Sequence, residues 1–347
     1  MTASRPSRLR AYAEFLAAVL YFFLAREVSR HFIQSIANEQ NEQWTPLLEQ
    51  AILVFFLIVG YAGMGLAFDR QSKPFSTQGL PRRPGWSREI ALGLAAGWAI
   101  TLVCVLPLTI AGGIAIRLSL APSSWVWLAA DTAFFALAAL AEEVAFRGYG
   151  FQRFVVAVGP LGATLGFAAF YAVVQALLPG SSHSSVAVSI ALSLVLSSAY
   201  LRTRALWLSW GLNFAWKAIR ALLFGLAIGG VNSHSPVVEG DPMGPFWVTG
   251  GGYGIDGSYI TFFILLAAIP VIFRITRDLD FRYNAPEIVP AGIPVDLDAA
   301  ARRQHEAAMG PAEPAAPALV QILPVATQPV PPESIKANPD TETNGGI

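Results

Sequence analysis

Two adjacent carboxylates and an arginine interrupt a long apolar stretch of the sequence, in Glu142-Glu143-Val-Ala-Phe-Arg147. A charged side chain at membrane depth costs on the order of 3 kcal/mol unless it is paired or faces a cavity, so such residues mark functional sites by default. Glu143 and Arg147 are four residues apart, which stacks them on one helical face where they can pair. Glu142 points about 100° away. This spacing leaves Glu142 free to do something else.

The composition of the whole chain predicts that these charges lie in a membrane protein. Of its 347 residues, 54% are hydrophobic and only 13% are charged, whereas a soluble domain carries about 25% charged residues. The net charge is zero and no long basic patch occurs, so membrane lipids are expected partners and nucleic acid is not. Cys104 is the single cysteine, which excludes an intrachain disulfide and a cysteine-based metal site.

Apolar segments that can be drawn as membrane helices follow one another along most of the chain. The sequence therefore predicts an all-α, polytopic transmembrane helix bundle of about eight spans, in residues 1–277. The fourth segment, with its continuation to Val158, is too long for a simple span of about 20 residues, so we expect it to be tilted or to project into the cytoplasm. The segments are 11–33, 46–68, 90–116, 124–154, 161–178, 184–201, 205–230 and 257–274.

Basic residues alternate from loop to loop in a way that predicts the orientation of the bundle. Lys and Arg occur before the first segment and in residues 69–89, 202–204 and 274–277. The loops 34–48 and 231–256 carry acidic residues and no Lys or Arg. We therefore expect an integral protein of the cell membrane with both termini in the cytoplasm.

The C-terminal part of the sequence has a different composition. Eleven of the 24 prolines lie between Pro286 and Pro339, among many alanines and few aromatic residues. Such a composition cannot bury a hydrophobic core. Residues 278–347 are therefore predicted to be a disordered Pro/Ala-rich cytoplasmic tail.

The charged stretch continues as Gly-Tyr-Gly-Phe-Gln-Arg-Phe, and together with Glu-Glu-x-x-x-Arg it resembles the first motif of the CAAX protease and bacteriocin-processing (CPBP) family of membrane endopeptidases. The segments 79–86, 92–93, 206–207 and 252–257 also resemble that family, so the resemblance covers most of residues 75–275. It implies the family's helix bundle. It also implies an intramembrane endopeptidase that hydrolyses peptide bonds of peptides or membrane-associated proteins.

The family's pattern continues with Phe-x-x-x-His on the next helix and His-x-x-x-Asn or Asp on a later one. In the family, the first glutamate and the first histidine activate a water, and the last histidine and the Asn or Asp stabilise the oxyanion. By this resemblance, Gln175 occupies the first histidine position, Asn213 the second, and Lys217 the Asn or Asp position. The implied site residues are Glu142, Glu143, Arg147, Gln175, Asn213 and Lys217.

These replacements change the expected chemistry. A carboxamide is a poor zinc ligand and is not a base near neutral pH. The zinc ion that the family resemblance implies would therefore have no histidine ligands here, and no cofactor is predicted. Gln175 could still hold a water, and Asn213 could donate to an oxyanion, with Glu142 as the only base. Lys217 and Arg220 share a helical face with Asn213. A lysine that reached Glu142 would neutralise it and weaken it as a base.

The resemblance therefore implies a CAAX-protease-like intramembrane endopeptidase with a divergent site, and one alternative stays open. The alternative is a catalytically inactive family member that binds peptides or acts as a membrane adaptor, with the glutamates in a buried ion-pair network that fixes helix register. A small-solute transporter would require related halves with broken helices, and no internal repeat is visible.

Asp131 and the four histidines are not expected to belong to the site. Asp131 lies eleven residues before Glu142, about three helical turns, and so on the same side. We interpret it as a polar residue at the outer end of the helix. The four histidines fall at predicted helix ends, in outer loops or in the tail, and are predicted to be solvated: His31, His183, His234 and His305.

Overall fold

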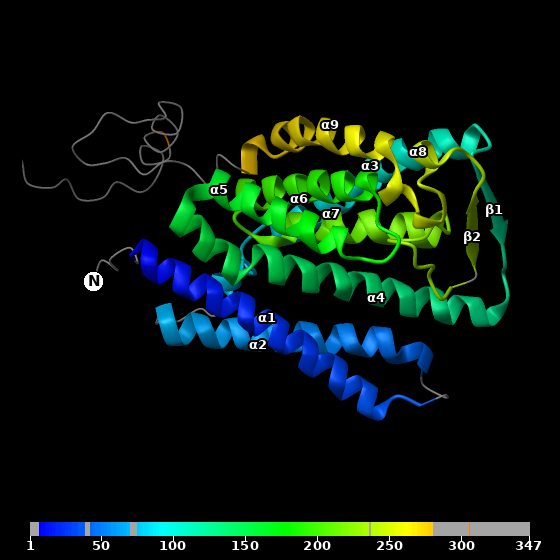
Figure 1. Ribbon diagram of the computed structural model, residues 1–347. Helices are drawn as coiled ribbons and strands as arrows, with labels where there is room; N and C mark the ends of the chain where they lie inside the picture. Colours follow the sequence, from blue (N-terminus) through cyan, green and yellow to red (C-terminus); the bar gives the residue numbers. More distant parts are fainter. Residues whose placement is uncertain (1–6, 39–41, 70–74, 236, 280–304, 306–347) are drawn as a thin grey trace, which may run out of the picture. The chain divides into compact units, whose positions relative to one another are not determined.

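A computed structural model describes residues 7–38, 42–69, 75–235, 237–279 and 305 of the chain (Figure 1). Helices dominate the described residues, which confirms the prediction of an all-α membrane bundle. The helices are α1 (Arg8–Ile36), α2 (Thr45–Asp69), α3 (Trp86–Ile110), α4 (Pro122–Arg147), α5 (Tyr149–Ala176), α6 (His183–Thr203), α7 (Leu206–Ala218), α8 (Phe246–Thr249) and α9 (Tyr259–Ile275). Short 3₁₀ helices lie at Glu42–Trp44, Ser76–Gln78, Gly251–Tyr253 and Ile255–Gly257.

The helices pack in an order that places α4 at the centre of the bundle. Figure 1 shows α1 and α2 together along one edge, with α3, α6, α7 and α9 on the other side of α4. Helix α4 contacts α2 on one side and α7 on the other, and α5 contacts both α1 and α6. The motif glutamates on α4 therefore lie where elements from both sides meet.

Four stretches of the described residues are long and apolar enough to cross a membrane by length and composition, and the chain is an integral membrane protein. These stretches are Glu42–Phe68, Trp86–Ile110, Pro122–Ala176 and His183–Thr203, and Tyr259–Ile275 is a shorter apolar helix. Each of the eight predicted segments overlaps a helix of the structure. The tail predicted from residue 278 onward lies almost wholly outside the described residues, so that prediction is untested.

Two of the predicted segments are shorter helices than expected. Helix α3 ends at Ile110, and β1 (Ile114–Leu118) follows and pairs antiparallel with β2 (Val238–Pro242). The turn between α3 and β1 contains Gly112 at φ 75°, a left-handed conformation that ends the helix. Helix α7 continues as one π-helical turn, Ile219–Leu223, and ends before Gly225 at φ 65°. The spans 90–116 and 205–230 were therefore wrong at their C-terminal ends.

The helix of the long fourth segment ends before Gly148, and the next helix, α5, is interrupted at Gly159. At Gly148, between α4 and α5, an added Cβ would lie 2.2 Å from the Val144 carbonyl oxygen. Within α5, Gly159 has φ 84° and precedes Pro160, so the helix is interrupted there. The ring of Phe154 lies 6.0 Å from that of Phe167, which shows that the two halves of α5 pack against each other. The second half consequently returns beside the motif end of α4.

Close helix contact fixes the position of α7 against α3. A Cβ added at Gly93 would lie 2.2 Å from the Leu208 carbonyl oxygen, and one added at Gly97 would lie 2.4 Å from that of Leu212. Glycines at such a crossing let two membrane helices approach closely, and association then rests on packing. Because α7 carries two of the predicted site residues, this contact also sets their distance from α4.

We expect Gly97→Ala to destabilise the protein by about 1–3 kcal/mol, because the new methyl group meets backbone that cannot move aside. Gly63→Ala is the matched control, since a Cβ added at Gly63 in α2 has nothing within 4 Å. The melting temperature in detergent should fall for the first variant and stay unchanged or rise slightly for the second. Equal melting temperatures would contradict the close contact of α3 with α7.

Candidate functional site

The centre of the candidate site is a buried ion pair in the last turn of α4. Arg147 Nη1 donates to Glu143 Oε1 at 3.1 Å, and both side chains are inaccessible to solvent. Arg147 Nη2 also donates to the Ser193 carbonyl of α6 at 3.3 Å. The pairing predicted from the four-residue spacing is therefore confirmed, and the arginine additionally joins α4 to α6.

Helix α7 brings an amide to both glutamates. Asn213 Nδ2 donates to Glu142 Oε2 at 3.1 Å and to Glu143 Oε1 at 3.0 Å. Carboxylates only accept hydrogen bonds, so the nitrogen of the amide must be the atom that faces them. Asn213 is thus the bridge that holds the two carboxylates at a fixed separation.

Lys217, one turn further along α7, forms an ion pair with Glu142 through Nζ and Oε1. The expectation that a lysine could reach Glu142 is confirmed. Tyr171 of α5 donates its hydroxyl to Glu142 Oε2 at 3.2 Å. Glu142 is therefore held from three sides, and the expectation that it stays free is wrong. The side chain of Glu142 is 28% exposed, while that of Glu143 is fully buried.

Tyr171 was not among the residues predicted for the site. A signal was available, because Tyr171 lies four residues before Gln175 and so shares its helical face. It also stands where the family pattern has phenylalanine before the histidine. A phenol is not a usual base or zinc ligand, but it can donate a hydrogen bond to a carboxylate.

Gln175 is turned toward a different partner. Its Nε2 donates to the hydroxyl of Tyr253, which belongs to the 3₁₀ turn Gly251–Tyr253 before α9. In the described part of the chain no hydrogen bond joins Gln175 to Glu142. The expected convergence of four residues is therefore found for Glu142, Asn213 and Lys217, whereas the side chain of Gln175 fastens α5 to the loop that precedes α9.

Comparison with known proteins finds one family model that matches the motif region of the chain. Residues 122–219 match the family model described as Rce1-like, type II CAAX prenyl endopeptidase. Over these residues the chain is similar to type II CAAX prenyl endopeptidases. The resemblance drawn from the motifs is confirmed over that range, which runs from the start of α4 to the π turn after α7. No curated protein and no solved structure matches the chain.

The side chains around Glu142 are unsuitable ligands for the zinc ion that the resemblance to CAAX proteases implies. Zinc takes thiolate, imidazole and carboxylate ligands, and here the neighbours of Glu142 are an ammonium, a carboxamide and a phenol. The ammonium would also repel a divalent cation at short range. Within the described ranges no group of three or more His, Cys, Asp and Glu residues gathers. No reaction step is therefore assigned to a metal.

Arg220 extends the charged side of α7 beyond Lys217. Its Nη1 forms an ion pair with Asp256 Oδ1 in the turn Ile255–Gly257, and its guanidinium lies 4.5 Å from the centre of the Trp216 ring. The sequence placed Arg220 on the face of Asn213, and the structure gives it a partner of its own. This pair and the Gln175–Tyr253 bond are two polar attachments of the loop before α9.

Asp131 and His234 differ from their predicted roles. Asp131 is buried rather than at an open helix end, and it accepts a hydrogen bond from the Ser235 backbone N–H at 2.7 Å. His234 Nδ1 lies 3.1 Å from Asp131 Oδ1, so this histidine is bound although its ring stays exposed. Asp131 therefore holds residues 234–235 against α4 and takes no part in the glutamate cluster. The other three histidines are exposed, as predicted.

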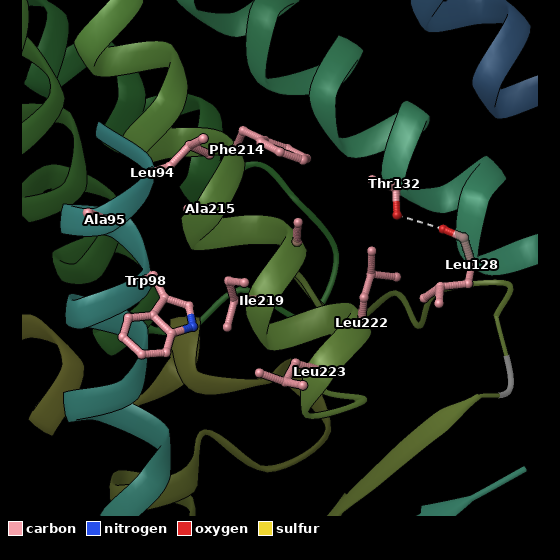
Figure 2. Close-up of a pocket in the computed structure, with 11 residues that line it drawn as sticks. Leu94, Ala95, Trp98, Leu128, Thr132, Phe214, Ala215, Ile219, Leu222 and Leu223 are labelled. Atoms are coloured by element: carbon pink, nitrogen blue, oxygen red, sulfur yellow. Dashed lines mark hydrogen bonds between the residues drawn. The ribbon is translucent and has the colours of Figure 1, made fainter. Parts of the chain in front are cut away.

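An apolar groove of about 540 Å³ lies on the neighbouring face of α7 (Figure 2). No residue of the glutamate cluster lines it. Figure 2 shows Thr132 with its hydroxyl bonded to the Leu128 carbonyl, a bond of 2.7 Å that leaves little polar surface for a ligand. The groove therefore suits hydrocarbon. Its lining residues are Leu94, Ala95, Trp98, Leu128, Thr132, Phe214, Ala215, Ala218, Ile219, Leu222 and Leu223.

We expect Arg147→Met to lower stability more than Glu142→Gln does. Without the guanidinium, Glu143 is a buried carboxylate without its cation, at a cost of roughly 3–5 kcal/mol, whereas Glu142 is partly exposed. The melting temperature in detergent measures the difference. The double variant Arg147→Met/Glu143→Gln should recover part of the loss, because it removes both charges together. Equal effects of the two single variants would contradict a dry Arg147–Glu143 pair.

Proposed function

We propose that this protein is a non-hydrolytic member of the CAAX protease family that binds peptide segments of membrane-associated proteins. The observation that carries the proposal is the ion pair of Lys217 with Glu142. The sequence predicted a divergent endopeptidase, with an inactive binding protein as the alternative, and this pair favours the alternative.

The contacts of Glu142 explain why it makes a poor general base. A base must take a proton from water, and its basicity falls when cations and donors stabilise the carboxylate form. Lys217, Asn213 and Tyr171 all donate to this carboxylate. These donors occupy three of the about four acceptor sites of the carboxylate, which leaves an attacking water one of them.

No replacement for the missing base stands at the family's histidine positions. Gln175 and Asn213 are carboxamides, which do not accept a proton near neutral pH. Gln175 is also engaged with Tyr253, and Asn213 with the two carboxylates. Hydrolysis would therefore depend on Glu142 alone.

The same geometry retains features that a binding site needs. The side chains of Glu142 and Lys217 are 28% and 13% exposed, so a ligand can reach a carboxylate and an ammonium. Peptide N–H groups pair with the first and carbonyl groups with the second. The apolar groove on α7 can take hydrocarbon, and the matched family model is named for prenyl endopeptidases.

Hydrolysis of membrane-associated peptides is the second candidate. It is favoured by the family match over the whole motif region and by the remaining exposure of Glu142. In this case Lys217 must leave Glu142 when the substrate enters, and Glu142 then acts as the only base.

A membrane-embedded, lipidated reporter peptide distinguishes the two candidates. We expect the purified wild-type protein to bind it and to cleave it no faster than Glu142→Ala does, because Lys217 compensates the charge of Glu142 in the wild type. Cleavage by the wild type that Glu142→Ala abolishes would establish the hydrolase instead. The variant Gln175→His/Asn213→His/Lys217→Asn should gain cleavage. The double histidine variant that keeps Lys217 is its matched control and should gain less.

We also propose that both termini lie in the cytoplasm of a cell whose plasma membrane holds the protein, as the basic loops predict. Glu239 and Arg82 are exposed residues in loops of opposite predicted side. In a Cys104→Ala background, an impermeant maleimide added to intact cells should label Glu239→Cys. It should label Arg82→Cys only after lysis, and the reverse result would discard this orientation.

A further inference from the structure

A row of serines runs along one face of α6, at Ser185, Ser189, Ser193 and Ser197. The first two use their hydroxyls locally, since Ser185 Oγ donates to the Ser182 carbonyl at 2.9 Å and Ser189 Oγ to the Val186 carbonyl at 2.8 Å. Ser193 and Ser197 are fully buried, and in the described part of the chain their hydroxyls have no hydrogen-bond partner. The two serine hydroxyls without a partner in the described ranges thus belong to Ser193, whose carbonyl accepts from Arg147, and to the serine one turn further on.

The guanidinium of Arg147 adds an independent observation at the same place. Its two terminal nitrogens donate to Glu143 and to the Ser193 carbonyl. Its Nε is buried and has no partner among the residues that the structure describes. Ser197 follows Ser193 by one turn, about 6 Å along the helix. Three unsatisfied polar atoms therefore come from two helices that Arg147 already joins.

Physical chemistry restricts what can satisfy these atoms. A buried polar group without a partner costs about 1–3 kcal/mol, and more when it is charged. The set comprises one N–H that only donates and two hydroxyls that both donate and accept. A cation would be repelled by the guanidinium, and an apolar group would satisfy none of the three. Water makes about three hydrogen bonds in such sites, as donor and acceptor.

We propose that Arg147 Nε, Ser193 Oγ and Ser197 Oγ form a site for bound water between α4 and α6. This site goes beyond the proposed function, because it concerns the Arg147–Glu143 pair and the face of α6. Bound water there gives the guanidinium Nε a partner and lowers the cost of keeping an ion pair within the bundle. It makes Ser193 and Ser197 ligands of water rather than spacers between helices.

The sign of a stability change tests the site. If the hydroxyls bind water, Ser193→Ala and Ser197→Ala remove a partner and should each lower the melting temperature of the full-length protein by about 2–4 °C. If the hydroxyls are dry and unpaired, their removal should leave the melting temperature unchanged or raise it, which would overturn the proposal. Ser189→Ala is the matched control, because that hydroxyl is already bonded within α6, and its change should be the smaller.

A structure of the full-length protein in lipid nanodiscs, at a resolution that shows water, provides the second measurement. We expect ordered water within hydrogen-bond distance of both Arg147 Nε and Ser193 Oγ. Direct bonds from these atoms to protein groups, with no water between them, would overturn the proposal. Neither measurement depends on peptide binding or hydrolysis, so its failure is distinct from failure of the proposed function.

Discussion

The buried pair of Arg147 with Glu143 is the interaction on which the rest of the site depends. The arginine ends α4 and reaches the Ser193 carbonyl of α6, and the glutamate accepts from Asn213 of α7. One ion pair thus joins three helices at one level of the bundle. Separating charges inside a bilayer is costly, so any movement of one helix relative to the others must keep these contacts or replace them.

Charge balance explains how a second acidic residue can lie beside this pair. Glu142 and Glu143 contribute two negative charges, and Arg147 and Lys217 contribute two positive charges. The cluster is neutral without a metal ion or a ligand. In the family pattern the position of Lys217 carries Asn or Asp, so here an added cation compensates the glutamate. The same compensation places an ammonium beside an oxygen of Glu142.

Several features of the site could be predicted from the sequence because they depend on local geometry. The Glu143–Arg147 pair follows from four-residue spacing on one helix. The approach of Lys217 followed from its helical face and from the position given by the family pattern. The positions of the helices along the chain followed from hydropathy. Two helices nevertheless end earlier than hydropathy indicated, because Gly112 and Gly225 adopt left-handed conformations there.

The features that sequence reasoning missed depend on contacts between distant parts of the chain. Gln175 and Tyr253 are 78 residues apart, and Asp131 and His234 are 103 residues apart. No periodicity on one helix indicates that its side chains will meet a particular residue of a loop. The strand β1 was likewise hidden, because its pairing partner lies in a loop that had no strand signal of its own.

The fold and the chemistry of the site rest on different interactions, which explains how one can change while the other is kept. Glycines bring α7 against α3 through backbone contacts at Leu208 and Leu212. Asn213 and Lys217 of the same helix are directed at α4 instead. Substitutions at the site therefore alter which donors surround Glu142 without removing the contacts that position α7. A chain with this bundle can therefore carry carboxamides and a lysine at the motif positions and keep the contacts that position α7.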